Sequence, residues 1–95
     1  MRMDKHQAMH VLMNNFAAID AAETRSGNGR VDVDSLVEIG RDGELNGTKF
    51  SEEVETACEV LTANGRNSVA LSAAGDDRFI TEGEAADKLD EMHDA

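Results

Sequence analysis

Apolar residues recur at helical spacing along most of the chain, and this periodicity limits the folds open to it. Amphipathic helices are expected over about 3–19, from about 34 to Gly40, over 51–64 and over about 81–92, with one or two helical turns near 68–74. No segment alternates apolar and polar residues for long enough to form a useful strand. A chain of 95 residues suits one domain. The expected fold class is therefore all-α, a single domain of four to five short helices.

The apolar positions of these helices, with two isolated apolar residues, form the expected core. They are Phe16, Ile19, Val31, Leu36, Val54, Leu61, Ile80 and Leu89. Cys58 falls in the apolar stripe of the third expected helix, so we expect a buried and unreactive thiol. As the single cysteine of the chain, it excludes an internal disulfide and a cysteine-rich zinc finger.

The charge balance is strongly acidic, with 20 Asp and Glu against 9 Lys and Arg, a formal net charge of −11. Binding to nucleic acid needs Lys and Arg that displace counterions, so we expect no nucleic-acid partner. No apolar run is long enough to span a membrane, and the amphipathic first segment does not resemble a cleaved secretory signal. The charge favours solubility, cations or a protein partner with a basic surface, and a solvated acidic surface is its simplest explanation.

Two polar loops have the same layout. "TRSGNGRVDVDS" (24–35) and "AAGDDRFITEGE" (73–84) each follow a helical segment and carry an apolar residue, Val31 or Ile80, at their eighth position. Each then leads into a helix, which is the EF-hand plan of helix, twelve-residue loop and helix. Pairing of the two loops predicts at most a two-residue β bridge between Val31 and Ile80. The alternative is two unrelated helix–turn–helix corners, each with one buried residue.

Residues with capping side chains mark where the helices begin. Asp32 and Thr81 are expected to cap the helices that leave the two loops, and Ser51 the helix between them. Thr81 and Glu84 also have the spacing of a capping box, in which each side chain accepts from the backbone amide of the other residue.

The first loop is a poor match to a calcium loop in a strict twelve-residue frame, because Asp32, at the ninth position, is the only carboxylate among the residues at ligand positions. An extended frame that starts at Asp20 is better. Asp20, Asn28, Asp32 and Asp34 would then supply side chains and Arg30 its carbonyl oxygen. Without a closing bidentate Glu, we expect calcium to bind with a dissociation constant of about a millimolar or weaker, if this loop binds it.

The second loop departs further from a calcium site. Ala73 and Gly75 stand where ligands are needed, and Arg78 replaces the turn glycine and brings positive charge. We expect this loop to keep its shape without metal. The cofactor expectation for the whole chain is therefore none, or weakly bound calcium.

The order of parts resembles one bacterial family. "FAAID", "GRVDVDSLVEI", "SEEVETACEVLTAN" and "NSVALSAAG" followed by "DDRFITEGEA" resemble the EF-hand-like repeats of type III secretion translocon proteins of the HrpF/NolX kind, over about 15–89. The resemblance implies paired helix–loop–helix units over about 3–40 and 51–93, with a connector over about 40–50. It also implies a role in secretion or host interaction, for a protein of the bacterial cytoplasm that a type III system could export.

No motif for catalysis is found, so we expect no enzyme. His6 and His10 share a helix face at a spacing that suits zinc, but they lack a third ligand and the Glu of the HExxH motif, so adventitious nickel or zinc binding is the most we expect. Three functions stay open: an EF-hand-like protein-interaction domain, a weak calcium-binding module, and an acidic inhibitor, immunity protein or nucleic-acid mimic that covers a basic partner.

Overall fold

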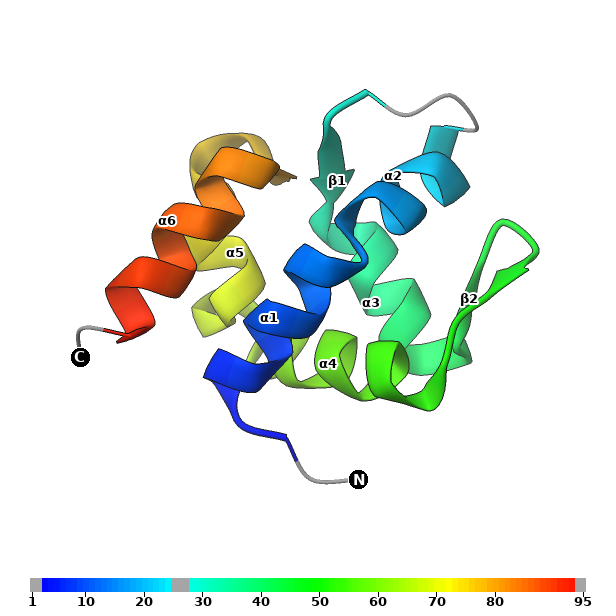
Figure 1. The fold of residues 1–95 in the computed structure, drawn as a ribbon, viewed down its shortest axis with the longest axis horizontal. Coiled ribbons are helices and arrows are strands. Elements are labelled where there is room, and N and C mark those ends of the chain that lie inside the picture. The colour runs from blue at the N-terminus through cyan, green and yellow to red at the C-terminus, as the bar shows by residue number, and fades with distance from the viewer. Residues whose placement is uncertain (1–2, 25–27, 94–95) are drawn as a thin grey trace.

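The computed structural model describes residues 3–24 and 28–93, and these ranges are mostly helical, as predicted (Figure 1). In chain order the elements are α1 (Lys5–Asn14), α2 (Phe16–Thr24), β1 (Arg30–Asp32), α3 (Val33–Asp42), β2 (Glu44–Leu45), β3 (Thr48–Lys49), α4 (Glu52–Thr62), the 3-10 turn η1 (Gly65–Asn67), α5 (Val69–Ala74), the 3-10 turn η2 (Gly75–Asp77), β4 (Phe79–Thr81) and α6 (Glu82–His93). Helix α1 crosses the middle of the molecule and packs on α4 and α6, and α3 packs on α4 (Figure 1).

The first predicted helix is two helices, α1 and α2, with a break at Asn15. The Asn15 side chain donates to the Val11 carbonyl at 2.8 Å, beside the Asn15 backbone amide, which donates to the same carbonyl at 3.1 Å. Helix α2 begins at once, because the Ile19 amide donates to the Asn15 carbonyl. It runs to Thr24, so the loop expected to start at residue 20 begins later than predicted.

The loops are joined by an antiparallel pair of strands, β1 and β4. Val31 lies opposite Ile80, which confirms the predicted pairing, and both side chains are fully buried. The pairing extends one residue to each side, so the expectation of a two-residue bridge was too small. Val31 and Ile80 thus form the central pair of this small sheet, and both belong to the hydrophobic core.

A second antiparallel pair, β2 and β3, lies in the segment predicted as a connector over about 40–50, and the sequence reasoning missed it. Asn46 and Gly47 form its two-residue turn, both with positive φ, at 51° and 87°. Asn-Gly is the strongest short signal of a β-hairpin, and here the strands are too short to show alternation. The Asn46 side chain also donates to the Ala22 carbonyl at 3.0 Å, so the hairpin tip caps the end of α2.

Gly40 was predicted to end its helix, and that prediction is wrong. Helix α3 continues to Asp42, and Gly43, at φ 73°, is the residue that ends it. A Cβ atom on Gly40 would lie 3.0 Å from the Glu59 backbone nitrogen, which is too close. Gly40 therefore packs directly on the backbone of α4 at Cys58 and Glu59, where a side chain would force the helices apart.

The core contains the residues predicted for it, with one exception. Phe16, Ile19, Val31, Leu36, Val54, Leu61 and Ile80 are buried. Leu89 is only partly buried, because it lies at the edge where α6 meets the core. Cys58 is buried as expected, and burial raises the pKa of its thiol to about 12. A thiol that stays protonated at neutral pH is a poor nucleophile.

Candidate functional site in the paired loops

Asp20, at the buried side of α2, holds the first loop in place. Its carboxylate accepts the amide of Asn28 at 3.0 Å and the amide of Gly29 at 2.7 Å. The side chain is 6% exposed, so these hydrogen bonds to a charged group are shielded from water. Asp20 thus holds the loop backbone by accepting hydrogen bonds from its amides. In a calcium loop the backbone is held instead through oxygen atoms that bind the cation.

A second carboxylate of α2 holds the strand that follows. Glu23 accepts the Asp32 amide at 2.7 Å, and the Asn28 side chain accepts the Arg30 amide at 3.2 Å. The Asp32 side chain in turn caps α3 by accepting the Asp34 amide at 2.8 Å, which confirms its predicted role. Each of these side-chain acceptors receives a backbone amide of the loop or of the first turn of α3.

The second loop is closed by local contacts. Asp77 accepts the Phe79 amide at 3.0 Å, which repeats the contact between Asn28 and Arg30 in the first loop. Arg78 adopts a left-handed backbone at φ 61°, and Gly29 at the matching position has φ 80°. Only glycine takes this conformation without steric cost. The described parts of the loops therefore share a left-handed turn followed by a strand, although one of them lacks the glycine.

The helix that leaves the second loop begins with the predicted capping box. Glu84 accepts the Thr81 amide at 2.9 Å, and Thr81 accepts the Glu84 amide at 3.1 Å. Glu84 stands at the twelfth position, where a calcium loop places its bidentate ligand. In this chain it stabilises the start of α6 instead.

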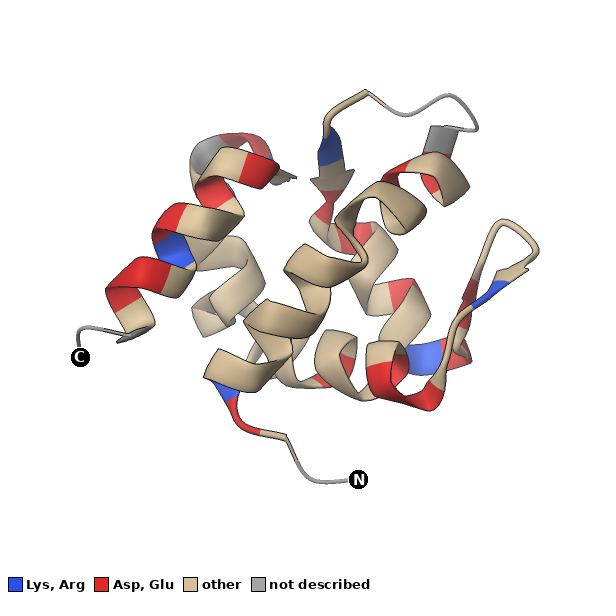
Figure 2. Ribbon diagram, viewed as in Figure 1, with Lys and Arg blue, Asp and Glu red and all other residues tan. Residues whose placement is uncertain are grey.

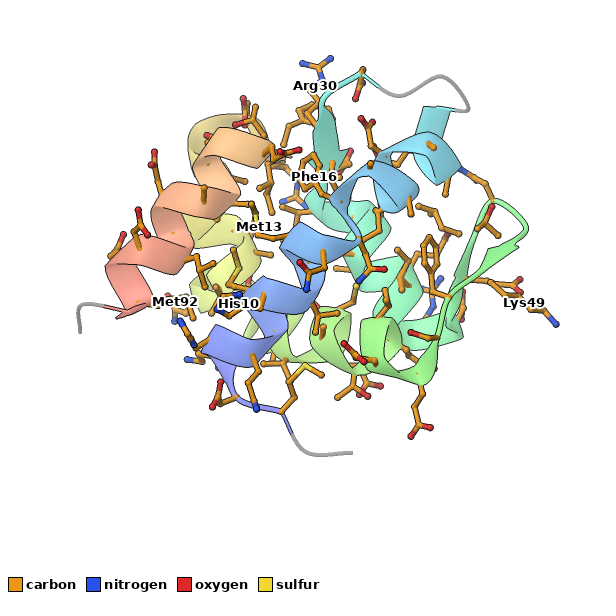
Figure 3. The ribbon with its side chains drawn as sticks, viewed as in Figure 1. His10, Met13, Phe16, Arg30, Lys49 and Met92 are labelled. Atoms are coloured by element: carbon orange, nitrogen blue, oxygen red, sulfur yellow. The ribbon has the colours of Figure 1, made fainter. Side chains whose placement is uncertain are left out.

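Side chains also tie the loops to each other. Arg78 of the second loop pairs with Asp34, in the first turn of α3. The Arg30 guanidinium lies 4.5 Å from the centre of the Phe79 ring, across the β1–β4 pair (Arg30 is labelled in Figure 3). The Val33 amide donates to the Arg78 carbonyl at 3.0 Å. The loops thus form one unit made of protein contacts.

These contacts decide how the proposed calcium ligands are placed. Asp20 uses both oxygens for backbone amides, Asp32 caps α3, and Asp34 pairs with an arginine. Within the described ranges, no three His, Cys, Asp or Glu side chains gather in a way that could hold a metal ion. The arrangement as it stands does not fit the six to eight oxygens that calcium takes. Binding by Asp20, Asn28, Arg30, Asp32 and Asp34 stays a prediction.

An apolar pocket lies beside the loops, where α3, α4 and α5 meet, and the sequence reasoning did not find it. Its volume is about 280 Å³, and it is lined by Val33, Val37, Thr62, Gly65, Ser68, Leu71 and Arg78. Val37 is 42% exposed, the one large apolar residue that is exposed in the described ranges. The signal in the sequence is that Val33, Leu36, Val37 and Ile39 make α3 apolar over more of its surface than one buried face needs.

Acidic residues are distributed over several elements. Figure 2 shows them along α6, at the start of α4 and on α3, with single basic residues between them. Among the described residues, no helix is long and apolar enough to cross a membrane.

Comparisons with protein-family models, with curated proteins and with solved structures found no match to this chain.

Proposed function

We propose that the chain is a small acidic, EF-hand-like protein-interaction domain, whose loops keep their shape without calcium and whose partner presents a basic segment. The observation that carries the proposal is the antiparallel pairing of β1 with β4, which joins two helix–loop–helix units through Val31 and Ile80. The equivalent left-handed residues, Gly29 and Arg78, support the same relation between the loops.

Protein contacts in the loops support the view that calcium is dispensable. The carboxylates of Asp20 and Glu23 already hold the backbone of the first loop, and Arg78 supplies positive charge next to Asp34. A cation would have to displace these partners before it could bind, and its own binding would then be weakened by that cost. We therefore assign the function to surface contacts rather than to metal sensing.

The pocket beside Val37 is the surface that we assign to the partner. Contiguous apolar groups at a hollow on the surface of a small domain favour a bound side chain over solvent. A volume of about 280 Å³ suits one or two aliphatic side chains. The net charge of −11 selects a basic segment over an acidic one, since complementary charge speeds encounter and excludes wrong partners. The proposed ligand is a basic amphipathic helix with an aliphatic anchor.

The distribution of charge is the reason to prefer this function over an acidic inhibitor or nucleic-acid mimic. A mimic places its carboxylates on one face to copy the spacing of phosphates. The acidic residues here lie on several elements, among them the neighbouring helices α3 and α4 and also α6, which lies on the other side of α1 in Figure 2. Arg78 is the charged residue in the lining of the apolar pocket, so the preference for a basic peptide rests on the net charge of −11 and not on the pocket itself.

A titration with two synthetic peptides tests the proposal. Both carry the same number of lysines, and only one has leucines on a single helical face. In chelator, we expect the amphipathic peptide to shift the amides of Val37, Thr62 and Leu71 and to bind at least about tenfold more tightly than the scrambled peptide. Val37→Glu should abolish that preference, and Thr48→Glu, on the exposed hairpin, should keep it. Equal binding of the two peptides would contradict an anchored mode.

The proposed link to bacterial type III secretion is supported by the loop resemblance alone. It is tested separately, by following the full chain in a bacterium with and without a functional type III system. Export that depends on the system would support the link, and equal export or none in both strains would remove it.

A further inference from the structure

We propose that His6 and His10 form a two-imidazole chelate site for a late first-row divalent cation, namely Cu²⁺, Ni²⁺ or Zn²⁺, at the pocket between α1 and α6, with Asp90 providing negative charge across that pocket. The site lies apart from the loops and uses nitrogen rather than oxygen donors. It does not depend on the function proposed above.

The positions of both histidines on α1 are fixed by the helix. Residues four apart lie on the same face, and the two ring centres are 4.7 Å apart with their planes at 88°. A cation bound by imidazole nitrogens sits about 2.0–2.1 Å from each of them. Rings already this close can converge on one ion by side-chain rotation, with no change in the backbone.

Helix α1 is held firmly enough to present the pair. Asp4 and Gln7 form a capping box at its first turn, with contacts of 3.1 and 2.7 Å. Ala8 and Leu12 are buried on the opposite side of the helix, so the histidines lie on a different face from these core residues. His6 is half-buried and His10 is exposed, so a cation can reach both from solvent.

The pocket in front of the pair has room for a hydrated ion. It has a volume of about 250 Å³ and is lined by His6, His10, Leu89 and Asp90. Figure 3 shows His10 on the part of α1 that lies next to α6 (Met92 is labelled on that helix). A facing carboxylate raises the local concentration of cations. Two protein nitrogens leave the remaining positions to water, which makes the site exchangeable rather than structural.

The donors select the class of metal. Imidazole suits copper, nickel and zinc, whereas calcium, magnesium and manganese prefer carboxylate, carbonyl and water oxygens. For one site, affinity is expected to rise from Mn²⁺ to Ni²⁺ to Cu²⁺ and to fall again at Zn²⁺. Calcium should not compete at the histidine pair, which separates this site experimentally from the loops.

Titration of the full chain with Zn²⁺ and Ni²⁺ at neutral pH tests the site, with imidazole nitrogen resonances and calorimetry as readouts. We expect one ion per chain and shifts of both ring spectra. His6→Ala and His10→Ala should each weaken binding about tenfold or more. His93→Ala, at the remaining histidine of the chain, should leave the affinity unchanged. Asp90→Asn should weaken it about two- to fivefold.

A spacing control distinguishes a chelate from single histidines. Lys5→His combined with His6→Ala keeps the number of histidines but moves one ring off the shared face, and it should bind as weakly as His6→Ala alone. Equal affinity of this variant and the wild type would overturn the chelate, as would loss of binding in His93→Ala. An unchanged affinity in Asp90→Asn would overturn the part given to the facing carboxylate.

Discussion

The two loops hold the same left-handed turn and the same strand pairing by different means. The first is held from outside, by Asp20 and Glu23 of the preceding helix, whereas the second is closed by its own Asp77 and by the capping box of the helix that follows. The anchors of the first loop accept the amides of Asn28, Gly29 and Asp32, which Asp20 and Glu23 reach from α2.

The two residues that pair the loops, Val31 and Ile80, should have the largest effect on stability when they are changed. Ile80→Ala removes a fully buried side chain from the β1–β4 pair and should lower the free energy of unfolding by about 2–5 kcal/mol. Denaturant unfolding followed by circular dichroism measures this change. Val37→Ala, at an exposed position, is the control and should stay within about 0.5 kcal/mol of wild type. Similar values for both variants would mean that the pair does not link the loops energetically.

The side chains that hold the two loops, Asp20 in the first and Asp77 in the second, should differ in their contribution to stability. Asp20→Ala leaves two amides of the first loop without their acceptor in a buried site, and should cost about 2–4 kcal/mol. Asp77→Ala removes a single exposed contact and should cost about 1 kcal/mol or less. Thermal or denaturant unfolding of the two variants measures the contrast. An equal cost would show that the first loop is not held from α2.

Substitutions at the turn position should have smaller effects than Asp20→Ala, with opposite expectations in the two loops. Gly29→Ala places a Cβ in open space but keeps the left-handed backbone, so it should cost about 1–2 kcal/mol from strain alone. Arg78→Gly relieves that strain but loses an exposed ion pair with Asp34, so its net effect should be within about 1 kcal/mol of zero. Unfolding midpoints compare the two. A large loss in Arg78→Gly would show that the ion pair, rather than the backbone, sets this turn.

The fold was predictable where local chemistry and periodicity agree. The capping residues Asp32, Ser51 and Thr81 start their helices as expected, and Val31 meets Ile80. The break at Asn15 was missed because the apolar spacing continues through it, although a polar side chain there can bond back to the helix.

Other features depend on tertiary contacts that spacing does not report. Gly40 was predicted to end its helix, but it lies inside α3, where the absence of a side chain lets the backbone of α4 pack against it. The sequence pattern around Asp20 predicts a metal ligand and an acceptor for backbone amides equally well, because a carboxylate can do either. Only the position of the Asn28 and Gly29 amides, 2.7–3.0 Å away, separates the alternatives.

The central claim is that protein groups, rather than a cation, hold the paired loops. Amide and methyl spectra recorded in chelator, and then with calcium added from micromolar to millimolar concentration, test it most directly, with magnesium as control. We expect the contact between Val31 and Ile80 to persist in chelator, and the amides of Gly29 and Asp32 to respond, if at all, only at about a millimolar or above. Loss of that contact in chelator, or saturation of those amides at micromolar calcium, would contradict the claim.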